Sequence, residues 1–162
     1  MHTSIHFTSP PRRRLGCLAL IRNAGGGVLL VEKKYKKDQG DPYPWGLPGG
    51  CAEENEDPLA AARREVEEEL GLAIELGEVL AVHHMPREGD SAEGINLVFH
   101  GGTAPAGAII RLPEELSGYE FVAPSELARY AAPYTVSRIK AALAAIPFSG
   151  AQYRSGHPTD AH

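Results

Sequence analysis

Apolar and polar stretches alternate along the chain in a way that predicts a small set of strands and helices. Residues 15–21 form a continuous apolar run, LGCLALI, which is typical of a strand buried on both faces. Three glycines follow within residues 23–27, and residues 28–31 are again wholly apolar. Because a Gly-rich turn between two apolar runs favours an antiparallel return, residues 15–31 predict a β-hairpin.

Residues 58–70 carry apolar side chains at steps of three and four, which predicts an amphipathic helix. The stripe expected to be buried comprises Leu59, Ala62, Val66 and Leu70. Asp57 is suited to be the N-cap, and Pro58 suits the first helical position because its missing N–H leaves nothing unsatisfied there. Gly71 follows the last turn, where a left-handed C-terminal cap is expected.

The second half of the chain predicts three further strand regions and a second long helix. Strand character extends over residues 74–85, with a break at Gly77, over residues 95–100 and over residues 114–122. A short helix begins at Pro124, and residues 135–146 have helical periodicity that ends at Pro147. This order of elements fits an α/β fold in which a mixed β-sheet lies between helices.

The length of 162 residues indicates one domain, which we place at residues 15–147. Residues 1–14 are polar and end in three arginines, so we expect a flexible N-terminal arm. Those arginines could contact phosphate, although a solvated terminus is the more ordinary interpretation. Residues 148–162 are polar with scattered Gly, Pro and His, and we expect a disordered tail.

The charge and the cysteine content of the chain limit the binding partners and the cellular compartment to be expected. The formal net charge of −5 argues against a nucleic-acid polymer as the main partner, since such binding relies on Lys and Arg neutralising phosphates. The two cysteines, Cys17 and Cys51, form no CxxC motif and indicate ordinary thiols in a reducing cytoplasm. No apolar run approaches the roughly 18 residues of a membrane span. A small anionic substrate stays possible if divalent cations neutralise its phosphates.

Three glutamates, Glu65, Glu68 and Glu69, lie on one flank of the helix predicted at residues 58–70. Side chains three and four positions apart on a helix have Cβ atoms roughly 5–6 Å apart, so these carboxylates repel one another. A cation between them removes that repulsion, and clustered carboxylate oxygens suit Mg²⁺ or Mn²⁺ rather than zinc. The alternative is an exposed acidic helix face that is merely solvated.

The residues around these glutamates follow the spacing G-x5-E-x7-R-E-U-x-E-E-x-G-U, where U is a bulky aliphatic residue. All nine specified positions match, and they are Gly50, Glu56, Arg64, Glu65, Val66, Glu68, Glu69, Gly71 and Leu72. A chance match at every position is rarer than roughly one in a million with ordinary residue frequencies. The pattern resembles the signature box of the Nudix hydrolases, and the preceding WGLPGG at residues 45–50 resembles the usual lead-in of that family.

This resemblance implies an α/β/α sandwich with a mixed sheet and a set of site residues. Glu65, Glu68 and Glu69, with the carbonyl of Gly49, would be metal ligands, and Glu65 or Glu69 would orient or deprotonate water. Arg64 and Glu56 would form a salt bridge that holds the loop on the helix, while Gly50 and Gly71 would be structural.

Three residues outside the box are also candidates for the site. In the family, a glutamate before the last strand often completes the metal site or acts as a base, and Glu115 is the counterpart, with Glu114 and Glu120 as close competitors. Lys33 falls where a basic residue faces the substrate phosphates. Trp45 either stacks on a ligand or anchors its loop against the core. His83 and His84 are expected to have no metal role.

The resemblance further implies a Mg²⁺-dependent enzyme, with Mn²⁺ as a possible substitute, that hydrolyses the pyrophosphate bond of a nucleoside diphosphate linked to another group. ADP-ribose, another nucleotide sugar and a nucleoside triphosphate all stay open as substrates. Two alternatives share the fold, namely a non-catalytic nucleotide-binding module and an isomerase of isoprenoid diphosphates. A homodimer would be in keeping with the family.

Overall fold

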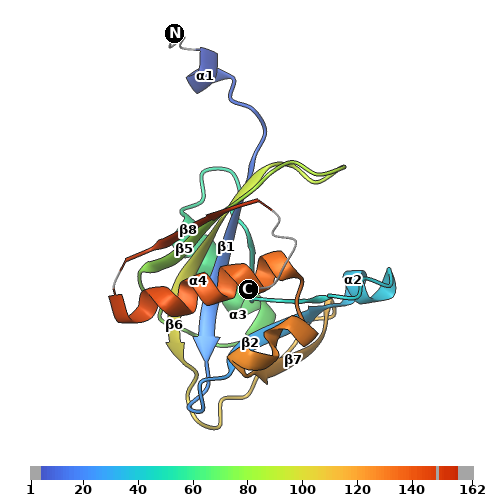
Figure 1. Cartoon of the computed structure of the whole chain (residues 1–162), viewed down its shortest axis with the longest axis vertical. Helices are drawn as coiled ribbons and strands as arrows, with labels where there is room; N and C mark the ends of the chain where they lie inside the picture. The colour runs from blue at the N-terminus through green and yellow to red at the C-terminus, as the bar shows by residue number, and fades with distance from the viewer. Residues whose placement is uncertain (1–4, 149, 157–162) are drawn as a thin grey trace.

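A mixed β-sheet of eight strands runs through the centre of the part of the chain that the structure describes (Figure 1). This computed structural model describes residues 5–148 and 150–156. The strands are β1 (Arg14–Arg22), β2 (Val28–Lys33), β3 (Trp45–Gly46), β4 (Gly49–Cys51), β5 (Val79–Met85), β6 (Gly94–Thr103), β7 (Leu116–Val122) and β8 (Gln152–Ser155). Their order is β3-β2-β1-β6-β5-β8, while β4 pairs with β1 and β7 pairs with β2. The pairs β1–β6 and β5–β8 are parallel, and the others are antiparallel.

Helices cover the sheet on both sides. The long helices α3 (Pro58–Leu70) and α4 (Pro133–Ala145) lie on opposite faces. The other helices are α2 (Lys34–Asp38), the 3-10 helices η1 (Pro124–Arg129) and η2 (Ile146–Phe148), and α1 (Ile5–Thr8), which lies away from the sheet (Figure 1). In Figure 1, α4 crosses the near face of the sheet and α3 lies behind it. The predicted α/β sandwich with a mixed sheet between helices is therefore confirmed.

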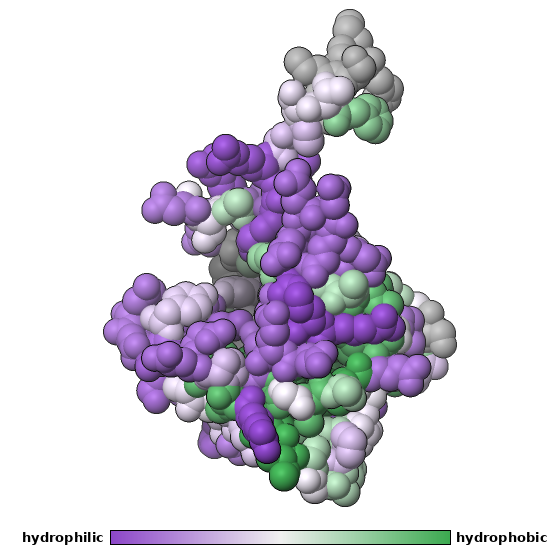
Figure 2. Space-filling model, turned by 180° about the vertical axis from the view of Figure 1, so that it is seen from behind, coloured by the Kyte–Doolittle hydropathy of each residue, from purple (hydrophilic) through white to green (hydrophobic). Residues whose placement is uncertain are grey.

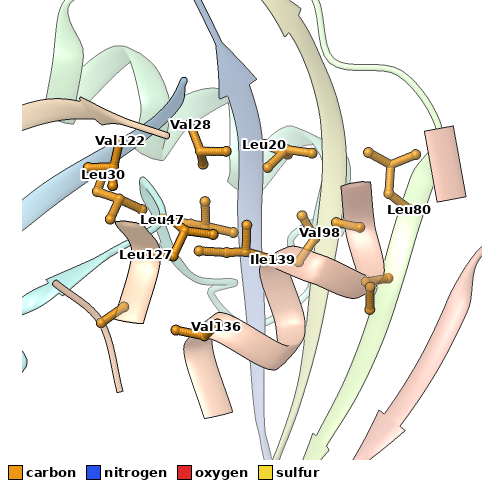
Figure 3. Close-up of a cluster of buried hydrophobic side chains, with 14 of the residues drawn as sticks. Leu20, Val28, Leu30, Leu47, Leu80, Val98, Val122, Leu127, Val136 and Ile139 are labelled. Carbon is orange, nitrogen blue, oxygen red and sulfur yellow. The ribbon is translucent and has the colours of Figure 1, made fainter. Parts of the chain in front are cut away.

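Each face of the sheet has its own hydrophobic core because strand side chains alternate between the faces. On β6, Val98 belongs to the core under α4, whereas Leu97 and Phe99 contact the core under α3. Figure 3 shows Val136 and Ile139 of α4 reaching toward the sheet residues of the first core. Burial of each such aliphatic side chain contributes roughly 1.5–3 kcal/mol, so both helices are fixed firmly on the sheet.

The helix predicted at residues 58–70 forms with the expected ends. The carboxylate of Asp57 accepts a hydrogen bond from the Ala60 backbone N–H at 2.9 Å, and Pro58 occupies the first turn. Gly71 closes the helix in the left-handed conformation, with φ of 66°. The N-cap, the C-cap and the buried stripe at Ala62, Val66 and Leu70 are confirmed, while Leu59 is half-buried.

The predicted hairpin of β1 and β2 forms only at its turn. The two strands are antiparallel, but their register contains a single pair, Arg22 with Val28. Beyond that pair, β1 is bonded to β4 and β6, while β2 is bonded to β3 and β7. The separation of the two strands admits β4, which carries Gly49 and Gly50, beside β1.

Two sequence expectations differ from the structure. The strand expected from residue 74 begins only at Val79. Before it, the Gly77 N–H donates to the His100 carbonyl, beyond the β5–β6 ladder. Within the tail expected to be disordered, Gln152–Ser155 instead forms β8 on the edge of β5. Backbone groups form this pairing, so the polar side chains of the segment gave no signal for it. Residues 149 and 157–162 of that tail lie outside the described residues.

The N-terminal segment projects away from the sheet (Figure 1). The side chain of Arg13 pairs with Glu93, and Arg14 is already the first residue of β1. Residues 1–4 of the predicted arm lie outside the described residues. Figure 2 views the side opposite α4, where hydrophilic residues dominate the upper part and hydrophobic residues gather lower on the body. Within the described residues, no helix has the length and apolar content that a membrane crossing requires.

Candidate functional site

Glu69, on the last turn of α3, is the most enclosed of the three predicted metal-binding glutamates. It is 7% exposed, its Oε2 accepts a hydrogen bond from the Gly49 N–H at 3.0 Å, and its Oε1 lies 3.6 Å from Lys33 Nζ. Burial raises the pKa of Glu69 above its usual value, and the Lys33 charge and the Gly49 N–H oppose that rise. A buried carboxylate fixed between a backbone amide and a lysine is well placed to bind a cation or to hold a proton.

Glu65 lies directly against the Gly-Gly segment of β4. A Cβ on Gly50 would come within 2.5 Å of the Glu65 carboxyl carbon. Gly49 has φ of +135°, and a Cβ there would come within 2.3 Å of the Cys17 carbonyl oxygen. Both glycines are therefore required for close approach, at Gly50 by a carboxylate and at Gly49 by the backbone of β1.

Arg64 links the loop before α3 to the carboxylates of the helix. Its Nε and Nη2 donate to the two oxygens of Glu56 at 2.8 and 2.9 Å, which is a bidentate pair. Its Nη1 donates to Glu65 at 2.9 Å and to the exposed Glu68 at 3.3 Å. The hydrogen bonds from Arg64 lower the pKa of Glu56 to about 2, and the same bonds, which Glu56 accepts, raise the pKa of Arg64. The structure therefore contains the predicted Arg64–Glu56 salt bridge.

The chemistry of these residues fits a divalent cation, but their side chains are engaged with other partners. Among the described residues, no three His, Cys, Asp or Glu side chains already form a group that could hold a metal ion. The reason is visible in the contacts: Arg64 occupies Glu65 and Glu68, while Gly49 and Lys33 occupy Glu69. Oxygen ligands on one rigid helix are nonetheless the type that Mg²⁺ prefers.

A cleft of about 240 Å³ opens beside the Gly-Gly segment. Four residues predicted from the sequence line it, and they are Lys33, Trp45, Gly49 and Gly50. Trp45 also meets Tyr130 edge to face, with ring centroids 5.6 Å apart and an interplanar angle of 87°. Trp45 is thus both an anchor for its loop and a wall of the cleft, so the two sequence interpretations are compatible.

Glu115 lies elsewhere. It precedes β7, its carbonyl accepts from the Lys34 N–H at 3.1 Å, and it borders a separate hollow that Tyr35, Asp38 and Glu114 also line. The structure does not bring it into the cleft beside Gly49, because its neighbour Leu116 pairs with Lys33 at the very end of β2. Its catalytic assignment stays a prediction.

The opposite wall of the cleft includes Asn96, Tyr134 and Arg138, which the sequence did not indicate as site residues. Arg14 lines it too, and it is one of the three arginines for which phosphate contact was the less ordinary interpretation. The four residues come from β1, β6 and α4, so no local spacing connects them. The available signals were weak: an asparagine inside the apolar run of residues 95–100, and an arginine between Val136 and Ile139 in the sequence of α4. Periodicity places neither on the apolar face of its element, because Asn96 alternates with the apolar residues of its strand and Arg138 lies about 100° around the helix from Ile139.

The comparisons with known proteins agree with this geometry. The family model for the NUDIX domain matches residues 11–143. A MutT-like protein of Streptomyces ambofaciens is 29% identical over 136 residues, covering 84% of this chain and 80% of that protein. Diphosphoinositol polyphosphate phosphohydrolase 2 of Rattus norvegicus is 38% identical over 71 residues, but these cover only 44% of this chain and 37% of that protein.

A solved structure supports the same assignment. The MutT protein of Methanosarcina mazei Go1 has a TM-score of 0.70 and 25% identity to this chain, over 82% of this chain and 94% of that one. The matched region contains every residue of the box, from Gly50 to Leu72, together with strands β1 to β7. The chain therefore belongs to the NUDIX domain family.

Proposed function

We propose that this Nudix-family enzyme hydrolyses the pyrophosphate bond of a nucleoside diphosphate linked to another group, by attack of water on phosphorus, with Mg²⁺ or Mn²⁺ as cofactor. The observation that carries the proposal is the position of Glu65 and Glu69 against Gly50 and Gly49, beside a cleft that Lys33 borders. A pyrophosphate in that cleft would lie against Lys33 and the two glycines, with the carboxylates of Glu65 and Glu69 directly beside those glycines.

Glu65, Glu68, Glu69 and the carbonyl of Gly49 would hold the metal ions. Bound there, they would supply charge neutralisation at the phosphate oxygens and a lowered pKa of water. Glu65 and Glu68 would then exchange Arg64 for the metal, while Arg64 would keep its bidentate pair with Glu56. Arg64 is then a positioning residue, since it keeps the loop on α3.

The protein's own groups supply binding and proton transfer. Lys33 places a positive charge at the cleft wall, where it can contact a phosphate oxygen as well as Glu69. Glu69 is a candidate general base because burial raises its pKa toward the range in which a carboxylate exchanges protons efficiently. Glu65 is the second candidate base. The Gly49 N–H donates to Glu69 and so fixes this carboxylate relative to the backbone of β4.

The substrate beyond the pyrophosphate is open at this level. Of the two relatives described above, one is named for diphosphoinositol polyphosphate and the other, the MutT-like protein, for no substrate, so their likeness supports the reaction class rather than one compound. A non-catalytic binding module is disfavoured because such modules commonly lose box carboxylates, and none is lost here.

A screen of nucleoside triphosphates, nucleotide sugars and dinucleotides with Mg²⁺ and with Mn²⁺ tests the proposal. We expect metal-dependent release of a phosphate-containing product from at least one compound, and loss of that release in EDTA. The exposed Glu67 is one position from Glu68, so Glu67→Gln is the matched control and should retain activity. A folded protein that turns over no diphosphate would contradict the proposal.

A further inference from the structure

The side of the sheet that faces α4 contains a cluster of polar side chains with no role in the box. Among the described residues, five polar or charged side chains are buried. One is Glu69, and the other four are His83, Asn96, Thr135 and Arg138. Three of these four, Asn96, Thr135 and Arg138, line the cleft described above. Buried polar groups need partners, so the contacts of this cluster indicate what it binds.

Arg138 is 8% exposed, and no ion pair of the described residues supplies it with a carboxylate. Its Nε donates to His83 Nδ1 at 3.1 Å, and its guanidinium lies 5.8 Å from the centroid of the Tyr134 ring. Because Nδ1 of His83 accepts that bond, its Nε2 is the atom that carries hydrogen, and it lies 3.1 Å from the Gly156 carbonyl. His83 in this tautomer is neutral, so it leaves the charge of Arg138 uncompensated.

Asn96 is 4% exposed, and only the oxygen of its carboxamide has a hydrogen-bond partner among the described residues. Its Oδ1 accepts from Arg14 Nη1 at 3.4 Å, but its Nδ2 has no hydrogen-bond partner in the part of the chain that the structure describes. Gly16 is opposite Asn96 in the parallel ladder of β1 and β6, and a Cβ there would lie 2.1 Å from Oδ1. The chain thus makes room for this carboxamide while leaving one of its donor groups unused.

These groups share a continuous wall with the box. The cleft that Gly49, Gly50 and Lys33 line is also lined by Arg14, Asn96 and Arg138. An adjoining cavity of about 420 Å³ is lined by the latter three residues and by Lys36, which also lines the cleft, and it contains a single carboxylate, Glu88. A ligand that places its pyrophosphate beside Gly49 can therefore extend its other half toward two guanidinium groups, next to the buried carboxamide of Asn96.

We propose that Arg14, Asn96 and Arg138 form a binding site for a second anionic group, a phosphate or a carboxylate, on the part of the substrate beyond the pyrophosphate. This inference rests on the proposed function and specifies the substrate class: a diphosphate compound with an additional anion, rather than one with a neutral sugar or base alone.

The donor inventory supports an anion over a neutral group. Arginine presents only donors, and the one carboxamide oxygen of the cluster is already occupied by Arg14. Burial lowers the pKa of Arg138 to about 10; Tyr134 opposes this, and the positive charge of Arg14 adds to it. An anion between the two guanidinium groups relieves their mutual repulsion and forms charge-assisted hydrogen bonds with both.

Titration with inorganic phosphate in EDTA tests the site without turnover. Trp45, the single tryptophan, lines the same cleft, so its fluorescence reports binding, and calorimetry gives the dissociation constant. We expect Arg14→Gln to weaken phosphate binding by roughly tenfold, the loss of one charge-assisted contact. The matched control is Arg129→Gln, because Arg129 is 80% exposed and pairs only with Glu126 among the described ion pairs. Its phosphate affinity should equal that of the wild type.

Asn96→Asp separates a binding role from a structural one. The new carboxylate would lie where it can pair with Arg14 and supply an internal anion. We expect this variant to lose phosphate binding while its melting temperature rises by several degrees. A purely structural polar cluster would instead show no link between stability and phosphate affinity.

Three outcomes would overturn the inference: absence of phosphate binding to the wild type, equal affinities for Arg14→Gln and Arg129→Gln, or undiminished binding by Asn96→Asp. Failure of the hydrolase proposal gives a different result. A protein that turns over no diphosphate, but whose phosphate binding depends on Arg14, would retain the anion site and lose only the reaction.

Discussion

The two walls of the cleft differ in how their charges are satisfied. On the box side, Arg64 is bonded to Glu56, Glu65 and Glu68, and Lys33 faces Glu69. On the α4 side, Arg138 has a neutral histidine and an aromatic ring as neighbours, and the amide donor of Asn96 has no partner among the described residues. The charged groups of the box side are paired within the protein, whereas those of the α4 side are not paired within the described part of the chain. This difference indicates that the α4 side relies more on a ligand to satisfy its charge and its hydrogen-bond donors.

The largest expected effect concerns the box. Replacing Glu69 by Gln keeps an oxygen for the Gly49 N–H but removes the negative charge. We expect turnover to fall roughly a hundredfold to a thousandfold, as for loss of one group that stabilises a charged transition state. Without divalent metal, the melting temperature should be equal or higher, because burial disfavours the ionised Glu69.

Steady-state kinetics of Glu69→Gln beside Glu67→Gln, with thermal melts in EDTA, measures both quantities. Equal turnover in the two variants would show that the box carboxylates take no part in the reaction. The α4 side would then be the remaining candidate for the catalytic site.

A smaller loss is expected at Gly50. Its replacement by Ala would place a methyl group within 2.5 Å of the Glu65 carboxyl carbon, so that side chain must move. We expect a fall in turnover of roughly tenfold or more, since displacement of a catalytic group by about 1 Å is costly. Gly46→Ala is the control, because nothing lies within 4 Å of a Cβ at Gly46. Similar kinetics for the two alanine variants would mean that the position of Glu65 is not critical.

On the α4 side, replacement of Arg138 should leave stability unchanged or raise it, in addition to its effect on substrate binding. Arg138→Met removes a buried charge that has no carboxylate partner, at the expense of one hydrogen bond to His83. We expect the free energy of unfolding to rise, or to fall by no more than about 1 kcal/mol. Denaturant unfolding beside the exposed-site variant Lys140→Met checks this. A loss of several kcal/mol would identify Arg138 as a structural residue.

The smallest effect is the pH dependence that the Arg64–Glu56 pair confers. The pKa of Glu56 is lowered from 4.5 to about 2, so the pair stabilises the folded state above pH 4.5 and loses this contribution as the pH falls toward 2. Unfolding midpoints of the wild type and of Arg64→Gln should therefore converge across that window. Parallel pH profiles would show that the pair is not coupled to folding.

The same contrast explains what could be predicted from the sequence. The helix of the box, its caps at Asp57 and Gly71 and the side shared by its glutamates follow from spacings of a few residues, and the structure has the caps and helix bounds as predicted. The Arg64–Glu56 bridge was likewise predictable within one motif.

The rest depends on long-range pairing. Strand β8 forms because the edge of β5 offers backbone partners, and the side chains of the tail do not encode that. Arg14, Asn96 and Arg138 meet only after β1, β6 and α4 have packed together. Glu115 was assigned by its position before the last predicted strand, and the pairing of β7 with β2 directs it to a different hollow.

The central claim is that water attacks phosphorus in a reaction that needs the box carboxylates and a divalent cation. Hydrolysis of a turned-over diphosphate in water enriched in oxygen-18, followed by mass spectrometry of the products, tests it most directly. The account predicts Mg²⁺-dependent incorporation of a single labelled oxygen into a phosphate product, retained in Glu67→Gln and reduced in Glu69→Gln in proportion to its turnover. Label found only in a carbon-bound hydroxyl group, or label in phosphate that is independent of metal and of Glu69, would contradict it.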